Sequence, residues 1–267
     1  MQNRNSDPLV SIVAPMYNLE EFIYETITSV LNQTYSNFEL ILVDDRSQDN
    51  TVNVVRNFDD NRIKLILNEK NIGAGETRNI GIRESKGDFI AFLDADDLWY
   101  PEKLEKQISF MRETGSLVCY TKYDVIDKNS FVYAGCGHIP KRATYHKILR
   151  RNYIRTSSLV YDISGVGGKV YFPKIRKRQD MLLFLDLIKR AGKADLLPEV
   201  TCSYRMHPGG ISAKKRSLLP YQWAAYRYEE KLPIFYCVFL MTAWFVLAGS
   251  ATLNRKAKER KARKAMS

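Results

Sequence analysis

The chain lacks the local signatures of several protein classes. Its four cysteines are scattered through 267 residues and form no C-x-x-C pair, which argues against a zinc or redox motif and favours a reducing compartment. The N-terminal segment has no apolar signal-peptide core. No internal repeat is visible. With 45% hydrophobic and 27% charged residues, the composition excludes a disordered chain, a collagen-like fibre and a disulfide-stapled miniprotein.

The formal net charge of +11 is concentrated at one end of the chain. Residues 255–267 contain seven basic residues and one acid, which is more than half of the excess. A smaller basic run, Lys169–Arg178, could meet an acceptor diphosphate or form a solvated loop. No helix-turn-helix, zinc-finger or RNP-like signature accompanies these runs, so we predict no nucleic-acid partner. The distribution points instead to an anionic membrane surface.

An uncharged stretch of 20 residues, Ile234–Leu253, comes directly before the basic tail. Its length could just span a bilayer, but spanning would separate the tail from the N-terminal domain, against the positive-inside tendency if that domain is cytoplasmic. A helix lying in the interface keeps both on one anionic face. We favour the interfacial or re-entrant helix, with a spanning helix and a buried core helix as alternatives.

Apolar runs and helical patterns alternate about four times in the first 120 residues. The runs predicted as strands are Val10–Ala14, Phe38–Val43, Ile63–Leu67, Asp88–Leu93 and Leu117–Thr121. Several are almost continuously apolar, as expected for strands buried on both faces. This pattern predicts an α/β fold with an open, doubly wound, mostly parallel sheet. Ligands of such sheets bind beyond the carboxyl ends of the strands, where Tyr17-Asn18, Asp44-Asp45 and Asp94–Asp97 would converge.

Asp94-Ala95-Asp96 is a D-x-D sequence at a strand end. Two carboxylates on one turn can hold a hard cation such as Mg²⁺ or Mn²⁺ and leave positions for phosphate oxygens. A solvated acidic turn is the alternative for any single D-x-D.

An ordered series of segments resembles the motifs of family 2 glycosyltransferases. The segments are Val10–Asn18, Ser29–Asp45, Ser47–Thr51, Asn71–Ala74, Ala74–Gly81, Lys86–Asp97 and Pro101–Leu104. The resemblance covers residues 8–125 closely and continues loosely to residue 212. It implies inverting enzymes with the GT-A fold, resembling bacterial polysaccharide and O-antigen biosynthesis enzymes.

The resemblance also implies a domain organisation. We expect a flexible N-terminus at residues 1–8 and a catalytic domain at 9–215, divided into a nucleotide-sugar half (9–125) and an acceptor half (126–215). A membrane-associated helical region at 216–254 and the basic tail follow. The expected location is the cytoplasmic face of the bacterial inner membrane, peripheral or monotopic.

Roles in donor binding follow residue by residue from the resemblance. Nucleotide-sugar contacts are expected from Pro15, Tyr17, Asp45, Arg78, Asp94, Ala95 and Asp96. Pro15 and Tyr17 would line the base pocket, and Asp45 would accept a hydrogen bond from a uracil-type imide. Asp96 would be the principal ligand of Mn²⁺ or Mg²⁺, with Asp94 on the ribose or the metal.

The neighbours of these residues are expected to have other roles. Asp44 is predicted to be structural, and Asp97 to cap the following helix. Arg205 and His207 are candidates for the diphosphate or for a closing loop, and His207 also for the metal. A surface loop histidine, a solvated Arg78 and a buried Tyr17 ring are the alternatives.

An inverting transfer needs a general base on the acceptor side. Related enzymes supply it as the Asp of a Glu-Asp pair, and here Asp180 keeps the carboxylate while Gln179 replaces the Glu. We therefore predict Asp180 as the base, with Asp186 as an alternative on an apolar helix face. The expected function is metal-dependent transfer of a hexose or N-acetylhexosamine from a UDP-sugar to a polyprenyl-diphosphate-linked sugar. A catalytically impaired nucleotide- or lipid-binding scaffold is the alternative, supported by Gln179.

Overall fold

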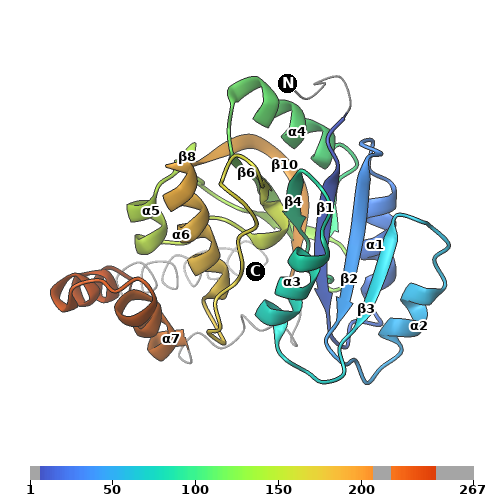
Figure 1. The fold of residues 1–267 in the computed structure, drawn as a ribbon, viewed down its shortest axis with the longest axis horizontal. Coiled ribbons are helices and arrows are strands. Elements are labelled where there is room, and N and C mark those ends of the chain that lie inside the picture. The colour runs from blue at the N-terminus through green and yellow to red at the C-terminus, as the bar shows by residue number, and fades with distance from the viewer. Residues whose placement is uncertain (1–6, 207–217, 245–267) are drawn as a thin grey trace, which may run out of the picture.

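The computed structural model describes residues 7–206 and 218–244, and within them a single ten-stranded mixed sheet (Figure 1). The strands are β1 (Val10–Met16), β2 (Phe38–Asp44), β3 (Ile63–Leu67), β4 (Phe89–Phe92), β5 (Leu98–Trp99), β6 (Val118–Ile126), β7 (Val132–Gly135), β8 (Arg142–Ala143), β9 (Val160–Asp162) and β10 (Ala194–Arg205). The main order is β3-β2-β1-β4-β9-β6-β10-β5, with β7 beside β6 and β8 beside β10.

The part of the sheet built from the N-terminal strands is parallel, as the apolar runs predict. β3, β2, β1 and β4 are joined by parallel pairing, and β6 is parallel to β10. The short strand β9 lies between β4 and β6 and is antiparallel to both. This strand is only three residues long, which is too short for a periodic pattern, so the sequence did not predict it. It joins the two parallel parts into one sheet.

Helices cover both faces of the sheet. They are α1 (Ile23–Leu31), α2 (Thr51–Arg56), α3 (Ala74–Glu84), α4 (Lys103–Thr114), α5 (Tyr145–Arg150), α6 (Gln179–Ala191) and α7 (Leu219–Ala224), with a 3-10 turn at Thr156–Ser158 and a π-helical turn at Ala225–Glu229. Alternation along β1 separates two cores: Val13 packs with α3 and α6, whereas Ile12 packs with α1 and α4. The result is the three-layer α/β arrangement that the sequence predicts.

The C-terminal helices pack on the same core as α6. Residues 234–244 are helical and lie with α7 on the α6 side of the molecule, away from β2 and β3 (Figure 1). Tyr226, Cys237 and Leu240 are completely buried in that core. The opposite side of helix 234–244 exposes large apolar side chains, namely Ile234, Phe235, Val238 and Phe239. In residues 7–206 and 218–244, no helix is long and apolar enough to cross a membrane.

A lysine is buried at the start of α4, beneath the loop that follows β4. Lys103 is completely buried, donates a hydrogen bond to Gln107, and has its Nζ 4.5 Å from the centre of the Trp99 ring. Burial lowers the pKa of Lys103 to about 8, because the charged form loses its hydration. Trp99 in turn donates to the carbonyl of Ser157 (2.9 Å), so this cluster supports the loop that carries the D-x-D sequence.

Candidate active site

The end of β2 supplies two adjacent carboxylates with different surroundings. Asp44 accepts hydrogen bonds from the backbone and hydroxyl of Ser47, which agrees with its predicted structural role. Asp45 is buried and accepts from the backbone N–H groups of Ile72 and Gly73, at 2.8 Å each, and from the Asn68 amide at 3.2 Å. A carboxylate offers about four acceptor positions, so these bonds leave room for one further donor.

The loop held by Asp45 leads directly into α3. Gly73 takes a φ of 88°, a left-handed conformation that glycine adopts without strain, and α3 begins at the next residue. One turn later, Arg78 forms an ion pair with Asp94 and lies over the Phe172 ring, with its Cζ 5.2 Å from the ring centre. Two residues predicted separately as donor contacts are thus in direct contact.

The hydroxyl group of Ser157 forms hydrogen bonds to two residues of the loop after β4. Ser157 Oγ accepts from the backbone N–H of Asp94 (3.0 Å) and donates to the carboxylate of Asp97 (2.5 Å). Asp97 is buried, and burial together with the charges of Asp96 and Asp94 raises its pKa well above the usual value. The prediction that Asp97 caps the next helix is wrong, because Glu102 occupies the N-cap of α4.

The first turn of α6 brings Asp180 to the same region. Its Oδ2 accepts from the side-chain amide of Asn152 at 3.3 Å. The preceding side chain, Gln179, accepts from the backbone N–H of Gly75 (3.3 Å) and donates to the carbonyl of Ile175 (3.1 Å). A Cβ at Gly75 would lie only 2.2 Å from the terminal amide group of Gln179, so glycine permits this close approach. The start of α6 is therefore bound to the start of α3, a contact that no sequence signal indicated.

A family model for glycosyl transferase family 2 matches residues 11–169. This chain belongs to glycosyltransferase family 2. It is therefore a glycosyltransferase.

Named relatives and solved structures agree with that assignment. The chain is 40% identical, over 218 residues, to the Escherichia coli UDP-Glc:alpha-D-GlcNAc-diphosphoundecaprenol beta-1,3-glucosyltransferase WfgD, covering 81% of this chain and 85% of WfgD. The fold resembles that of S. aureus TarS 1-349 in complex with UDP-GlcNAc, with a TM-score of 0.67, 21% identity, and coverage of 88% and 71% of the two chains. It also resembles the mannosyltransferase PcManGT from Pyrobaculum calidifontis in complex with GDP-Man and Mn²⁺, with a TM-score of 0.65, 20% identity, and coverage of 98% and 77%. These similarities confirm the predicted GT-A fold.

The remaining predicted donor residues of this glycosyltransferase lie near the ends of β1 and β4. Pro15 is buried in β1 opposite Val43, and Tyr17, just beyond the strand, is 46% exposed. Ala95 is buried, and its carbonyl accepts from the Thr26 hydroxyl at 3.0 Å. Asp96 is partly buried. His207 lies outside the described residues.

Arg205 does not offer its guanidinium to a diphosphate in this structure. Its side chain is completely buried and forms an ion pair with Glu25 (2.8 Å). It also donates to the carbonyls of Asp96 (2.7 Å), Asp127 (3.3 Å) and Lys128 (3.1 Å), and to the Ser130 hydroxyl (3.0 Å). The expected phosphate contact is therefore wrong for this arrangement. Arg205 instead fixes the backbone of the D-x-D loop from behind.

Asp186, the alternative base, also differs from expectation. Its side chain is 43% exposed and pairs with Arg190 one turn along α6, at 3.2 Å. The residue therefore faces solvent and not an apolar surface.

The described residues provide at most part of a metal site. They contain no cluster of three or more His, Cys, Asp and Glu side chains placed to hold a metal ion. Asp94 and Asp96 are nevertheless close enough for their charges to raise the pKa of Asp97, and a divalent cation would relieve this concentration of negative charge. A pair of carboxylates fits a cation whose other ligands are phosphate oxygens.

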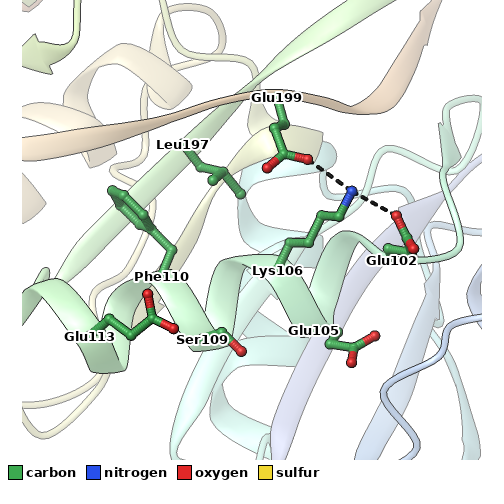
Figure 2. A pocket seen from close by; sticks show the side chains of 8 residues that line it. All are labelled: Glu102, Glu105, Lys106, Ser109, Phe110, Glu113, Leu197 and Glu199. Atoms are coloured by element: carbon green, nitrogen blue, oxygen red, sulfur yellow. Dashed lines mark ion pairs between the residues drawn. The ribbon is translucent and has the colours of Figure 1, made fainter.

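A surface hollow of about 400 Å³ between α4 and β10 is separate from this site (Figure 2). Four of its lining residues are glutamates, and Lys106 pairs with two of them, Glu102 at 2.6 Å and Glu199 at 2.8 Å. None of the predicted donor or acceptor residues lines it. Its excess of carboxylates opposes the binding of a nucleotide diphosphate.

Proposed function

We propose that this glycosyltransferase transfers a hexose or N-acetylhexosamine from a UDP-sugar to a hydroxyl of a polyprenyl-diphosphate-linked sugar in bacterial surface polysaccharide (O-antigen or capsule) synthesis. One observation carries the proposal. A continuous set of contacts runs from Asp45 through the 72–73 loop to Gly75, and from Gly75 to Gln179, next to Asp180. The donor residues and the acceptor-side carboxylate thus share one support. The relative WfgD, whose name specifies UDP-Glc and a diphosphoundecaprenol acceptor, supports the choice of substrates.

On the donor side, Pro15 and Tyr17 border the space for the base, and Asp45 has an acceptor position left for an imide N–H. Arg78 and Asp94 would contact the diphosphate and ribose. Asp94 and Asp96 would hold Mn²⁺ or Mg²⁺, and His207 is a further candidate ligand. Such an ion, when bound, stabilises the negative charge of the leaving diphosphate as a Lewis acid.

On the acceptor side, Asp180 would take the proton of the attacking hydroxyl. The acceptor oxygen then bonds to the anomeric carbon as the bond from that carbon to the UDP oxygen breaks. Attack opposite the leaving group inverts the configuration. The hydrogen bond from Asn152 to Oδ2 orients the carboxylate and leaves Oδ1 for the acceptor hydroxyl.

The test is a transfer assay with a panel of UDP-sugars, Mn²⁺ or Mg²⁺, and a synthetic lipid-diphosphate GlcNAc acceptor. We expect Asp180→Asn to lower kcat by about 10²–10⁴-fold with unchanged UDP affinity. Asp186→Asn, on the same helix and with the same charge change, is the matched control and should retain activity. Full activity of Asp180→Asn would refute the base assignment.

The alternative function, a nucleotide- or lipid-binding scaffold, rests on Gln179 standing where related enzymes have Glu. The Gln179 side chain forms hydrogen bonds with Gly75 and Ile175, so a glutamine at this position has a structural role here. Retained UDP binding without transfer from any donor in the panel would favour the scaffold.

We also propose that the protein lies on the cytoplasmic face of the inner membrane, through the outer side of helix 234–244. Phe235 is 74% exposed and Ile234 61% exposed, and the chain after the helix carries the basic residues of the tail. Phe235→Ser with Val238→Ser should weaken flotation with phosphatidylglycerol vesicles, as should removal of residues 255–267. Phe131→Ser, on an exposed apolar hairpin elsewhere, should not. Equal losses at the two apolar surfaces would contradict the proposal.

A further inference from the structure

Arg178 lies in the turn that opens α6, two residues before Asp180. Its φ is 68°, an uncommon conformation for a residue with a side chain, and such strain is often retained at functional sites. The side chain is partly buried, and its Nε is completely buried without a hydrogen-bond partner. Among the described residues, its guanidinium has no ion pair with a carboxylate.

The other buried arginines near the site are satisfied differently. Arg205 has Glu25 and three carbonyl acceptors, and Arg78 has an ion pair with Asp94, although its Nε is also buried without a partner. Burial lowers the pKa of Arg178, because the charged form is partly desolvated, and the negative charge of nearby Asp180 only partly opposes this shift. Buried polar groups in proteins are nearly always paired, so a buried Nε without an acceptor on a partly exposed arginine fits an anion that is supplied from outside the chain.

The surroundings of Arg178 are cationic and aromatic. Its Cζ lies 5.9 Å from the centre of the Trp244 ring, and Lys177 Nζ lies 5.6 Å from the centre of the Tyr221 ring. Both rings belong to the C-terminal helices. These helices therefore lie beside the two cations. Asp180 follows Arg178 by two residues in the sequence.

An exposed apolar surface lies on the outer side of helix 234–244. Trp244 follows the buried Cys237 by seven residues and the buried Leu240 by four, so it lies on the inner side of that helix. Trp244 is at the far end of helix 234–244, whose outer side carries the exposed Phe235, Val238 and Phe239. At a rise of 1.5 Å per residue, the distance from Phe235 to Trp244 is about 13 Å. The exposed apolar side suits contact with a membrane surface, from which the anionic head of a lipid-linked molecule would approach the cation at the end of this helix.

We propose that Arg178, assisted by Lys177, binds the diphosphate of an isoprenoid-linked acceptor. The proposal rests on the proposed function, because it names the element that holds the acceptor of that reaction. Binding the diphosphate two residues before Asp180 places the first sugar of the acceptor beside the base. The Arg178 side chain would therefore position the acceptor and would not contact the donor nucleotide.

The experiment compares Arg178→Gln and Arg178→Lys with Arg176→Gln in detergent micelles. Arg176 is exposed on the same loop, so its variant has the same charge change without the enclosed position. Two acceptors are used, GlcNAc joined to a lipid by a diphosphate and GlcNAc joined to the same lipid directly. We expect Arg178→Gln to lower kcat/KM for the diphosphate acceptor by about 10- to 100-fold, mainly through KM. Activity on the phosphate-free acceptor, the affinity for UDP, and Arg176→Gln should be unchanged, with Arg178→Lys intermediate.

An equal fall in activity on both acceptors, or weaker UDP binding by Arg178→Gln, would overturn the proposal. A direct binding measurement with geranylgeranyl diphosphate, in the absence of any donor, separates the site from the reaction. Arg178-dependent binding without sugar transfer would leave the site standing and remove the proposed function. Sugar transfer that does not depend on Arg178 would support the proposed function and would overturn the proposed diphosphate site. A matching loss of binding to phosphatidylglycerol vesicles would identify a general phospholipid headgroup site and would also overturn the acceptor assignment.

Discussion

Replacing Lys103 with methionine should change how the stability of the protein depends on pH. In the folded protein the Lys103 ammonium is buried without a carboxylate partner among the residues described, and its pKa is about 8. In the unfolded chain the pKa is near the ordinary value of 10.5. The folded state therefore loses the proton at lower pH than the unfolded state, so stability rises with pH between these values and falls as the pH drops towards 8.

The magnitude follows from the two pKa values. At 1.36 kcal/mol per pKa unit, the charged lysine costs about 3 kcal/mol at pH 7 and about 2 kcal/mol at pH 9. Methionine has a similar length and no charge, so Lys103→Met removes this cost. We expect the variant to be more stable than the wild type at pH 7, and its advantage to shrink by about 1 kcal/mol by pH 9.

Urea unfolding of both proteins at several pH values between 7 and 9 measures this difference. The charge of Lys103 lowers the pKa values of the buried thiols Cys119 and Cys202, which burial nevertheless raises to about 11 and about 12. Both thiols therefore stay protonated in the folded proteins up to pH 9, and their contribution comes from the unfolded chain, which is alike in the two proteins. Parallel stability profiles would refute the reasoning, because they would mean that Lys103 titrates alike in the folded and unfolded states.

Three further changes test the supports of the site. Arg205→Met should lower the free energy of unfolding by about 3 kcal/mol in urea titrations, since several buried acceptors lose their donor, and a loss below about 1 kcal/mol would show that those acceptors are hydrated instead. Asp45→Asn should reduce the hydrogen-exchange protection of the backbone amides at residues 72 and 73, because one carbonyl oxygen cannot replace two carboxylate oxygens; unchanged protection would contradict the geometry. Gly75→Ala should displace the Gln179 side chain, and a thermal-denaturation cycle with Gln179→Ala should give a coupling of at least about 0.5 kcal/mol, whereas additive effects would mean the two residues do not touch.

Local patterns were sufficient to predict the framework of this molecule. The apolar runs located β1 to β4, and the carboxylates that follow β2 and β4 lie at the ends of parallel strands as expected. The ion pair between Arg78 and Asp94 brings together two residues whose predicted roles in donor binding remain predictions. These features depend on residues close together in sequence, where periodicity and strand ends carry the information.

Long-range contacts were the part that the sequence did not reveal. Arg205 pairs with Glu25, 180 positions away, and nothing in its neighbourhood distinguishes a buried arginine from one that binds phosphate. The contact between Gln179 and Gly75 likewise depends on how α6 meets α3. The left-handed conformation of Arg178 is a tertiary effect, since nothing local requires it.

The antiparallel strand β9 has a consequence for synthesis of the chain. β4 gains its second neighbour only when residues 160–162 have been made, although β4 itself ends at Phe92. At about 5–20 residues per second, the intervening segment takes roughly 3 to 14 s to translate. During that interval the Phe-Ile-Ala-Phe sequence of β4 is an unpaired apolar edge on the nascent protein, the kind of edge that promotes aggregation. Completion of the sheet therefore depends on a three-residue strand made long after the strands that it joins.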